Sequence, residues 1–201
     1  MRRLLAVIGV VVAAAFLVGL ASQAKAKEAR YVGAESCSRC HKKDKDGSQY
    51  KIWQGTKHAK AYETLGTAKA KEAAKKVGVT SDPQKSEACL VCHTTGYGQP
   101  ESAFEHKFEV KDGVQCEACH GAGSLYKSRK TMKKIREELG PNKKGKSATA
   151  EKTGFVLPNE KTCQVCHSQE VKHNGKTYKN PSHKDFNFKE RWEEIKHPIP
   201  K

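Results

Sequence analysis

The clearest periodic pattern of apolar and polar positions lies near the C-terminus, where Phe188, Trp192 and Ile195 recur at i, i+4 and i+7. This spacing places the three side chains on one face of a helix. The segment begins with an asparagine, a residue that caps helices well, and Pro198 follows its end. The pattern therefore predicts an amphipathic helix over residues 187–196.

Two further helices are predicted from composition and from their end signals. One covers residues 49–77, which include an Ala/Lys-rich run, and it ends at Gly78. The other covers residues 128–139 and stops at a Gly-Pro pair. Strand patterns are weak, and the best of them is the short piece at residues 108–110. The pattern is typical of a mainly α, loop-rich, single-domain protein.

The N-terminus carries a targeting segment. Arg2 and Arg3 precede an unbroken apolar run at residues 4–20, and Ala24-Lys25-Ala26 gives a small-x-small cleavage site. This is the plan of a cleaved secretory signal peptide over residues 1–26, leaving residues 27–201 as the mature domain. The alternative is an uncleaved membrane anchor, because 17 apolar residues lie near the lower limit for a membrane span. Both interpretations predict export from the cytoplasm.

The composition leaves little material for an ordinary core. Only 36% of the chain is apolar, 30% is charged, and the formal net charge is +16. Without Arg2, Arg3 and Lys25, 35 basic and 22 acidic residues still give +13. Such a balance usually indicates disorder, because too little apolar surface is available to offset chain entropy. The chain is therefore either largely unfolded or given its core by something other than side chains.

The eight cysteines resolve this question, because they form four Cys-x-x-Cys pairs and each pair is followed directly by a histidine. A disulfide framework or zinc ribbons would explain the pairs but not the histidines. The Cys-x-x-Cys-His motif is the attachment site of a c-type haem, with the histidine as the proximal iron ligand. The predicted haem-attaching cysteines are Cys37, Cys40, Cys89, Cys92, Cys116, Cys119, Cys163 and Cys166, and the proximal ligands are His41, His93, His120 and His167.

Four covalently attached haems also explain the composition, because large apolar macrocycles supply the missing core. We expect the motifs to lie on short turns between the helices, and the apoprotein to be disordered. The expected architecture is a compact tetrahaem c-type cytochrome with a haem-dominated core. Its high positive charge does not indicate nucleic-acid binding, because the protein is exported.

Residues 127–152 contain ten basic and three acidic residues. This segment is either a solvated face or a docking patch that steers an acidic redox partner to an exposed haem edge. The sequence leaves both interpretations open.

Five histidines remain as candidates for the distal side of the irons. We expect His58 to be a ligand, because small alanines beside it let its helix approach a haem closely. His197, at a helix end before a proline, suits a ligand and a surface residue equally. His106, His173 and His183 lie in charged loop sequence and are expected to be solvated. Counting alone cannot show an open iron, because five candidates exceed four vacancies.

Several segments resemble the cytochrome c-554 family of tetrahaem periplasmic cytochromes, related to the type that takes electrons from hydroxylamine oxidoreductase in ammonia oxidisers. They are Trp53 followed closely by KHAKA, TTGYGQ after the second motif, and CEACHGAGS at the third. The resemblance implies a mostly helical fold with closely spaced haems. It also implies that His58 and His197 are distal ligands of the third and fourth haems, in an order not assigned. The second haem, held by His93, would be five-coordinate.

The sequence departs from this family where the first haem's distal histidine is expected, after the third motif. The stretch SLYKSRKTM has no histidine, but Met132 falls within about a residue of the expected place. A thioether is a recognised haem ligand that raises the reduction potential, whereas a methionine can also fill a helix face towards the core. If Met132 is not the ligand, the first haem is open or takes a lysine or a loop histidine.

The function favoured by these features is periplasmic electron transfer through four haems between redox proteins, by a carrier that is not an enzyme. A second hypothesis is a small reductase of nitric oxide, hydroxylamine or nitrite at an open five-coordinate haem, with Tyr97, Tyr126 or a lysine as proton donor. A third is a sensor or scaffold subunit of a larger redox complex.

Overall fold

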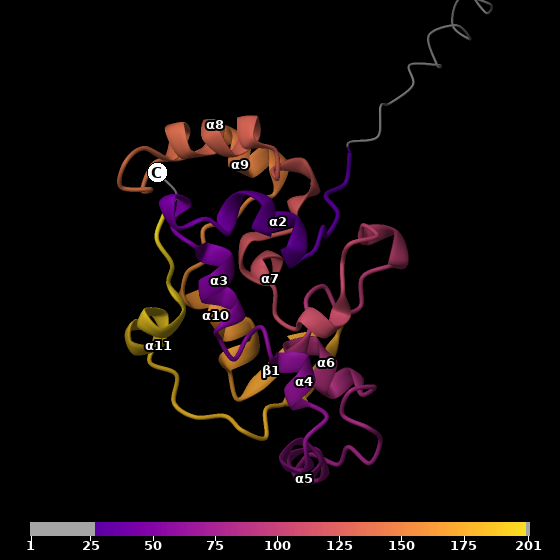
Figure 1. Cartoon of the computed structure of the whole chain (residues 1–201). Helices are drawn as coiled ribbons and strands as arrows, with labels where there is room; N and C mark the ends of the chain where they lie inside the picture. The colour runs from indigo at the N-terminus through magenta and orange to yellow at the C-terminus, as the bar shows by residue number, and fades with distance from the viewer. Residues whose placement is uncertain (1–26, 200–201) are drawn as a thin grey trace, which may run out of the picture.

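The computed structural model describes residues 27–199, and the predicted targeting segment at residues 1–26 lies outside them. The chain is mainly helical and loop-rich, and it forms one domain with a small two-stranded sheet (Figure 1). The α-helices are α2 (Ala34–His41), α3 (Gln49–Gln54), α4 (Ala61–Thr64), α5 (Ala68–Lys76), α6 (Glu87–His93), α7 (Cys116–His120), α8 (Arg129–Leu139), α9 (Ala148–Thr153), α10 (Glu160–His167) and α11 (Phe188–Ile195). Short 3-10 turns are η2 (Asp44–Asp46), η3 (Glu101–Ala103), η4 (Val110–Asp112) and η5 (Gly123–Leu125). No helix within residues 27–199 is long and apolar enough to cross a membrane.

Two of the predicted helices are confirmed with their caps. The side chain of Asn187 accepts hydrogen bonds from the first turn of α11, and Ser128 accepts one from the first turn of α8. The long helix predicted over residues 49–77 is wrong. It is divided into α3, α4 and α5, because the chain leaves the helical path at Gly55 and again before Thr67, which caps α5.

The weak strand pattern at residues 108–110 does not form a strand, since Val110 begins the 3-10 turn η4. The two strands lie elsewhere, at β1 (Glu170–His173) and β2 (Lys176–Lys179), paired antiparallel with His173 opposite Lys176. Asn174 and Gly175 join them, with φ angles of 48° and 76°. This Asn-Gly turn has the left-handed backbone that matches the twist of a two-residue hairpin.

The Cys-x-x-Cys-His motifs lie on short helices rather than on turns, which corrects our expectation. The helices are α2, α6, α7 and α10, and each of them ends at the histidine of its motif. Residues at i, i+3 and i+4 share one face of a helix. Both cysteines and the histidine of a motif can therefore meet one planar group.

The apolar core is small and lies at one end of the molecule. Tyr126, Ile135, Leu139 and Ala150 form a buried cluster beneath α8 and α9, which pack together at the top of Figure 1. At the opposite end α5 projects away from the other helices (Figure 1). Between these ends lie the four motif helices, where buried apolar side chains are few in the described part of the chain.

Candidate haem-binding centre

The eight cysteines are present as free thiols, and none is joined to another in a disulfide. All of them are half-buried, on the four motif helices. Free, paired thiols on one helix face are the groups that attach to the two vinyl groups of a c-type haem. The donor set therefore fits the group that the motifs predict.

Two histidine pairs have a spacing that suits the two sides of one metal ion. The ring centroids of His58 and His167 are 6.0 Å apart, and those of His120 and His197 are 5.9 Å apart. A metal–imidazole bond is about 2 Å long and the ring centre lies about 1 Å beyond the nitrogen, so opposite ligands have centroids about 6 Å apart. The ring planes are inclined by 77° and 45°, so neither pair is stacked face to face. The geometry fits a second ligand at the fourth motif and at the third.

Hydrogen bonds define which ring nitrogen of several histidines is free. The Nδ1 atoms face oxygen acceptors: His41 the side-chain oxygen of Gln49 (3.2 Å), His93 Ala61 O (2.8 Å), His120 Val156 O (2.9 Å) and His197 Pro198 O (3.3 Å). These oxygens can only accept, so Nδ1 carries the proton and donates it. Nε2 is left with a free lone pair, as in most metal-ligating histidines.

The paired histidines favour the neutral form that ligation requires. Partial removal from water is the main cause that lowers the pKa of His58, His120, His167 and His197, although the last two residues are still exposed. The proximity of His167 lowers the pKa of His58 further, and the proximity of His197 does the same for His120. Aromatic rings cover two of these groups, with Phe155 parallel to His120 at 5.6 Å and Phe186 stacked on His167 at 4.9 Å.

The turn that carries His58 is fixed against the segment before the third motif. His58 O accepts hydrogen bonds from Ala61 N (3.1 Å) and Val114 N (3.0 Å), and the indole of Trp53 donates to Val114 O (2.8 Å). A side chain at Gly113 would lie 2.7 Å from His58 O, so the backbones meet closely there. These contacts explain why a tryptophan precedes the KHAKA stretch.

The motifs touch one another in a defined sequence. The first motif lies against the third, since α2 contacts α7 and Glu117 of α7 accepts hydrogen bonds from Val32 N and Gly33 N just before α2. The side chains of Cys92 and Cys166 lie close together, which brings the second motif near the fourth. Cys119 of the third motif lies near Cys163 of the fourth, and burial, with a smaller contribution from Cys163, raises the pKa of the Cys119 thiol to about 11. The spatial order is thus first, third, fourth, second.

The first and second motifs lie at the ends of this order, and they differ from the inner two. Within residues 27–199, the ring contacts pair neither His41 nor His93 with a second histidine. Met132 is half-buried on α8 and packs against the apolar cluster of Tyr126 and Ile135. Met132 thus fills a helix face towards the core, which was the alternative to iron ligation. Ligation of the first haem by Met132 stays a prediction.

The remaining histidines have different surroundings. His106 and His183 are exposed, as expected. His173 is half-buried at the end of β1, 6.1 Å from the ring of Tyr97, and its Nε2 is buried without a partner in the described structure. We expected it to be solvated, and that was wrong because the Asn-Gly turn folds it onto Gly98.

Two buried polar residues beside the motifs were missed in the sequence. Gln49 contacts His41, and Glu117, between the cysteines of the third motif, accepts three backbone hydrogen bonds. Both side chains form hydrogen bonds with backbone groups far away in the sequence, and no local sequence pattern predicts such contacts.

Comparison with known proteins identifies relatives of this chain. The family model described as cytochrome c554 and c-prime matches residues 36–121, which contain the first three motifs. Cytochrome c-554 of Nitrosomonas europaea is 32% identical over 161 residues, which are 78% of this chain and 65% of that protein. The chain thus spans just under two thirds of the length of this relative. No solved structure matches the chain. With covalently bound c-type haem implied by motifs, geometry and relatives alike, the chain belongs to the cytochrome c-554 family.

Proposed function

We propose that this protein carries electrons in the periplasm between redox proteins, through four covalently bound c-type haems. One haem would attach at each Cys-x-x-Cys-His motif, and the segment 1–26 would direct export. Bound haem supplies one-electron chemistry at iron, and the protein contributes its position and its axial ligands.

The observation that carries this proposal is the pair of histidine distances near 6 Å. His58 would be the second ligand at the fourth motif, and His197 the second ligand at the third. Two strong ligands leave no site for a substrate, so such centres only exchange electrons. The proximity of neighbouring motifs along the order first, third, fourth, second supports close spacing of all four groups.

A second candidate function concerns the end of this order. His93 has no histidine ring opposite it in the described residues, and the loop that follows it carries Tyr97 beside the half-buried His173. An open iron there would suit a small reductase of nitric oxide, hydroxylamine or nitrite. Rapid binding of carbon monoxide at one haem, with repeated turnover of one of these compounds, would favour this function over simple transfer.

The function is tested by haem counting and spectroscopy on the holoprotein. We expect four haems by mass and by pyridine haemochrome assay, and two bis-histidine irons in near-infrared magnetic circular dichroism. His58→Ala and His197→Ala should each convert one low-spin iron to high-spin, whereas the matched control His106→Ala, at an exposed site, should convert none. Fewer than four haems, or low-spin signals that survive both substitutions, would contradict the proposal.

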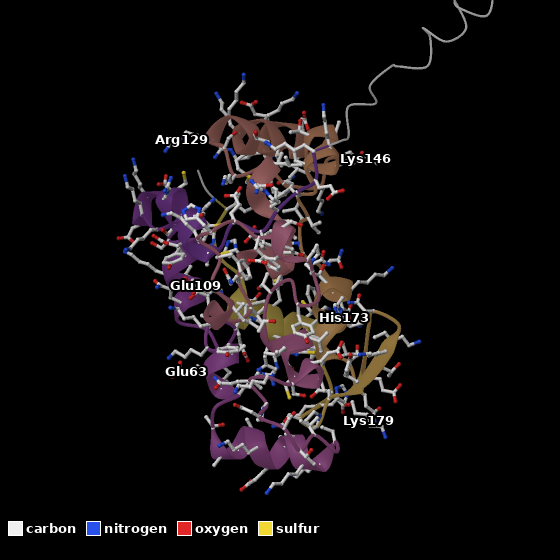
Figure 2. All side chains as sticks on the ribbon, turned by 90° about the vertical axis from the view of Figure 1, so that its right-hand side faces the viewer. Glu63, Glu109, Arg129, Lys146, His173 and Lys179 are labelled. Atoms are coloured by element: carbon white, nitrogen blue, oxygen red, sulfur yellow. The ribbon has the colours of Figure 1, made fainter. Side chains whose placement is uncertain are left out.

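The redox partner is proposed to be acidic and to dock on a basic platform, which we define as residues 127–152. α8 and α9 lie in this platform, and Figure 2 shows Arg129 and Lys146 at the same end of the molecule. Three of its lysines form ion pairs, whereas Arg129, Lys130, Lys144 and Lys146 are exposed and form no ion pair within residues 27–199.

A protein surface suits this platform better than a lipid bilayer. The apolar side of α8 is buried, with Ile135 only 1% exposed, so the helix offers polar side chains alone to the outside. Membrane-bound amphipathic helices need a free apolar face. The platform also lies beside the third motif, since Phe155, just after it, covers His120.

Charge reversal tests this docking surface, with a reduced acidic ferredoxin as the probe. At low salt, Lys130→Glu with Lys144→Glu should slow electron transfer about tenfold, and 1 M salt should abolish the difference. Lys69→Glu with Lys71→Glu makes the same charge change on α5 and should have a much smaller effect. Equal slowing by both pairs would mean that net charge alone matters, and binding to anionic vesicles would point to a membrane instead.

A further inference from the structure

The side chain of Gln49 lies between the first motif and the C-terminal segment. It is buried, with 6% of its surface exposed, at the start of α3. Its Oε1 lies 3.2 Å from Nδ1 of His41, and its Nε2 donates to Asp46 O at 2.7 Å and to Pro198 O at 2.8 Å. One amide therefore joins parts of the chain that are 149 residues apart.

The chemistry of these partners fixes the orientation of the amide. Two backbone carbonyl oxygens can only accept, so the NH₂ group of Gln49 must face them. Its oxygen then faces His41, and Nδ1 of that ring must carry a proton and donate it. The free lone pair of His41 is therefore on Nε2, the nitrogen that a c-type motif offers to iron.

The second partner of Gln49 leads to a different motif. Pro198 follows His197, whose ring lies 5.9 Å from His120 of the third motif. The chain leaves α11 at Ile195, and residues 196–199 are exposed. The other hydrogen bonds of this segment are local, from Lys196 N to Trp192 O and between His197 and Pro198. Within residues 27–199, the bond from Gln49 to Pro198 is thus the long-range hydrogen bond that holds the segment carrying His197.

We propose that Gln49 is a positioning residue for two haem centres at once. It sets the tautomer of His41 at the first motif, and it keeps His197 opposite His120 at the third. This inference rests on the proposed haem ligation. It means that the ligands of two adjacent centres are held by a single side chain, so a change at this amide alters both.

Two substitutions separate the two roles. Gln49→Leu removes both contacts. Gln49→Glu keeps an acceptor for Nδ1 of His41, and a stronger one, but it cannot donate to Asp46 O or Pro198 O. A charged acceptor makes the opposite nitrogen a better donor to iron and lowers the potential of that centre.

The experiment is magnetic circular dichroism and a spectroscopic redox titration of the fully haem-loaded variants. Both substitutions should give one more high-spin iron than the wild-type protein, from loss of His197. In addition, the potential of the first centre should fall in Gln49→Glu and rise in Gln49→Leu. Gln84→Leu is the matched control, because Gln84 is half-buried and donates to Tyr62 O (3.3 Å) without a contact to a histidine. It should change neither signal.

A double-mutant cycle guards against a general loss of structure. In the His197→Ala background, Gln49→Leu should add no further high-spin iron, because the ligand that it positions is already absent. The inference would be overturned if both Gln49 variants had the same spin states as Gln84→Leu. It would also be overturned if Gln49→Leu and His197→Ala added their high-spin irons in the double variant. The proposed haem ligation is tested independently of Gln49. A wild-type protein without bis-histidine signals would refute that ligation, whatever the variants show.

Discussion

The carboxylate of Glu117 offers a sharp test of how the first and third motifs are held together. Glu117 is 3% exposed, and it accepts hydrogen bonds from Val32 N (2.8 Å), Gly33 N (2.9 Å) and Gly123 N (2.7 Å). The first two donors immediately precede α2, and the third follows α7. One side chain thus clamps the start of the first motif helix to both ends of the third.

The cost of Glu117→Gln follows from these three bonds. Glutamine keeps one acceptor oxygen, so Val32 and Gly123 can still donate to it, with weaker neutral bonds. Gly33 N would face an NH₂ group and lose its partner. A hydrogen bond to a charged group contributes about 1.5–3 kcal/mol and a neutral one about 1 kcal/mol. Burial raises the pKa of the Glu117 carboxyl as the main cause, and relief of that desolvation offsets part of the loss. We expect a net destabilisation of about 2–4 kcal/mol.

Urea unfolding of the haem-loaded protein, followed by far-ultraviolet circular dichroism, measures this difference. The midpoint should fall and the slope with urea should stay constant. Glu109→Gln is the control, because its ion pair with Lys111 (3.8 Å) is exposed and should contribute less than about 1 kcal/mol. A Glu117→Gln protein as stable as the wild type would refute the reasoning, since it would show that desolvation cancels all three bonds.

Three further substitutions test other parts of the structure. If Met132 ligates the iron held by His41, Met132→Ala removes a histidine–methionine band from the near-infrared magnetic circular dichroism spectrum; an unchanged spectrum with a lower urea midpoint would assign Met132 to the apolar cluster. Hydrogen bonds from Ser147 and Thr149 lower the pKa of Glu138 to about 2, so its stabilising effect is full above the ordinary value of 4.5 and is lost as the pH falls towards 2. The melting temperature of Glu138→Gln should therefore lie below that of the wild type at pH 7 and equal it near pH 2. Gly98→Ala places a Cβ 2.8 Å from His173 Nε2 at a φ of +80°, and faster hydrogen exchange in the β1–β2 hairpin should report the strain, of about 1–2 kcal/mol from the backbone alone.

Local chemistry explains which features could be predicted from the sequence. The motifs have fixed spacing because two thiols and one imidazole must reach one group, and the caps of α8 and α11 depend on single residues next to the helix. The break in the helix predicted at residues 49–77 was missed because the segment as a whole is rich in Ala, Lys and Glu, whereas tertiary contacts of the His58 turn decide the path there. The hairpin was missed although Asn174-Gly175 is a strong turn signal, because its strands are short and highly charged.

The pairing of histidines could not be read in the same way. The residues suggest that His58 is a ligand, but its partner His167 is more than a hundred positions away and is brought near only by the folded chain. The same holds for Gln49 and Pro198, and for Glu117 and Val32, which are 85 residues apart. Contacts of this kind depend on the whole topology, so no window of sequence contains them.

The distribution of the core links these observations to the function. Packed apolar side chains gather under α8 and α9. The four motif helices, by contrast, contact one another mainly through hydrogen bonds and histidine side chains. A hydrogen bond contributes only about 1 kcal/mol net, and a buried neutral imidazole contributes less than an apolar ring of its size. Such contacts orient helices well but cannot offset the entropy of ordering them. The same residues that would ligate and position the haems thus need an apolar group between them to fold, and for that reason we regard the electron path and the hydrophobic core of this protein as one structure.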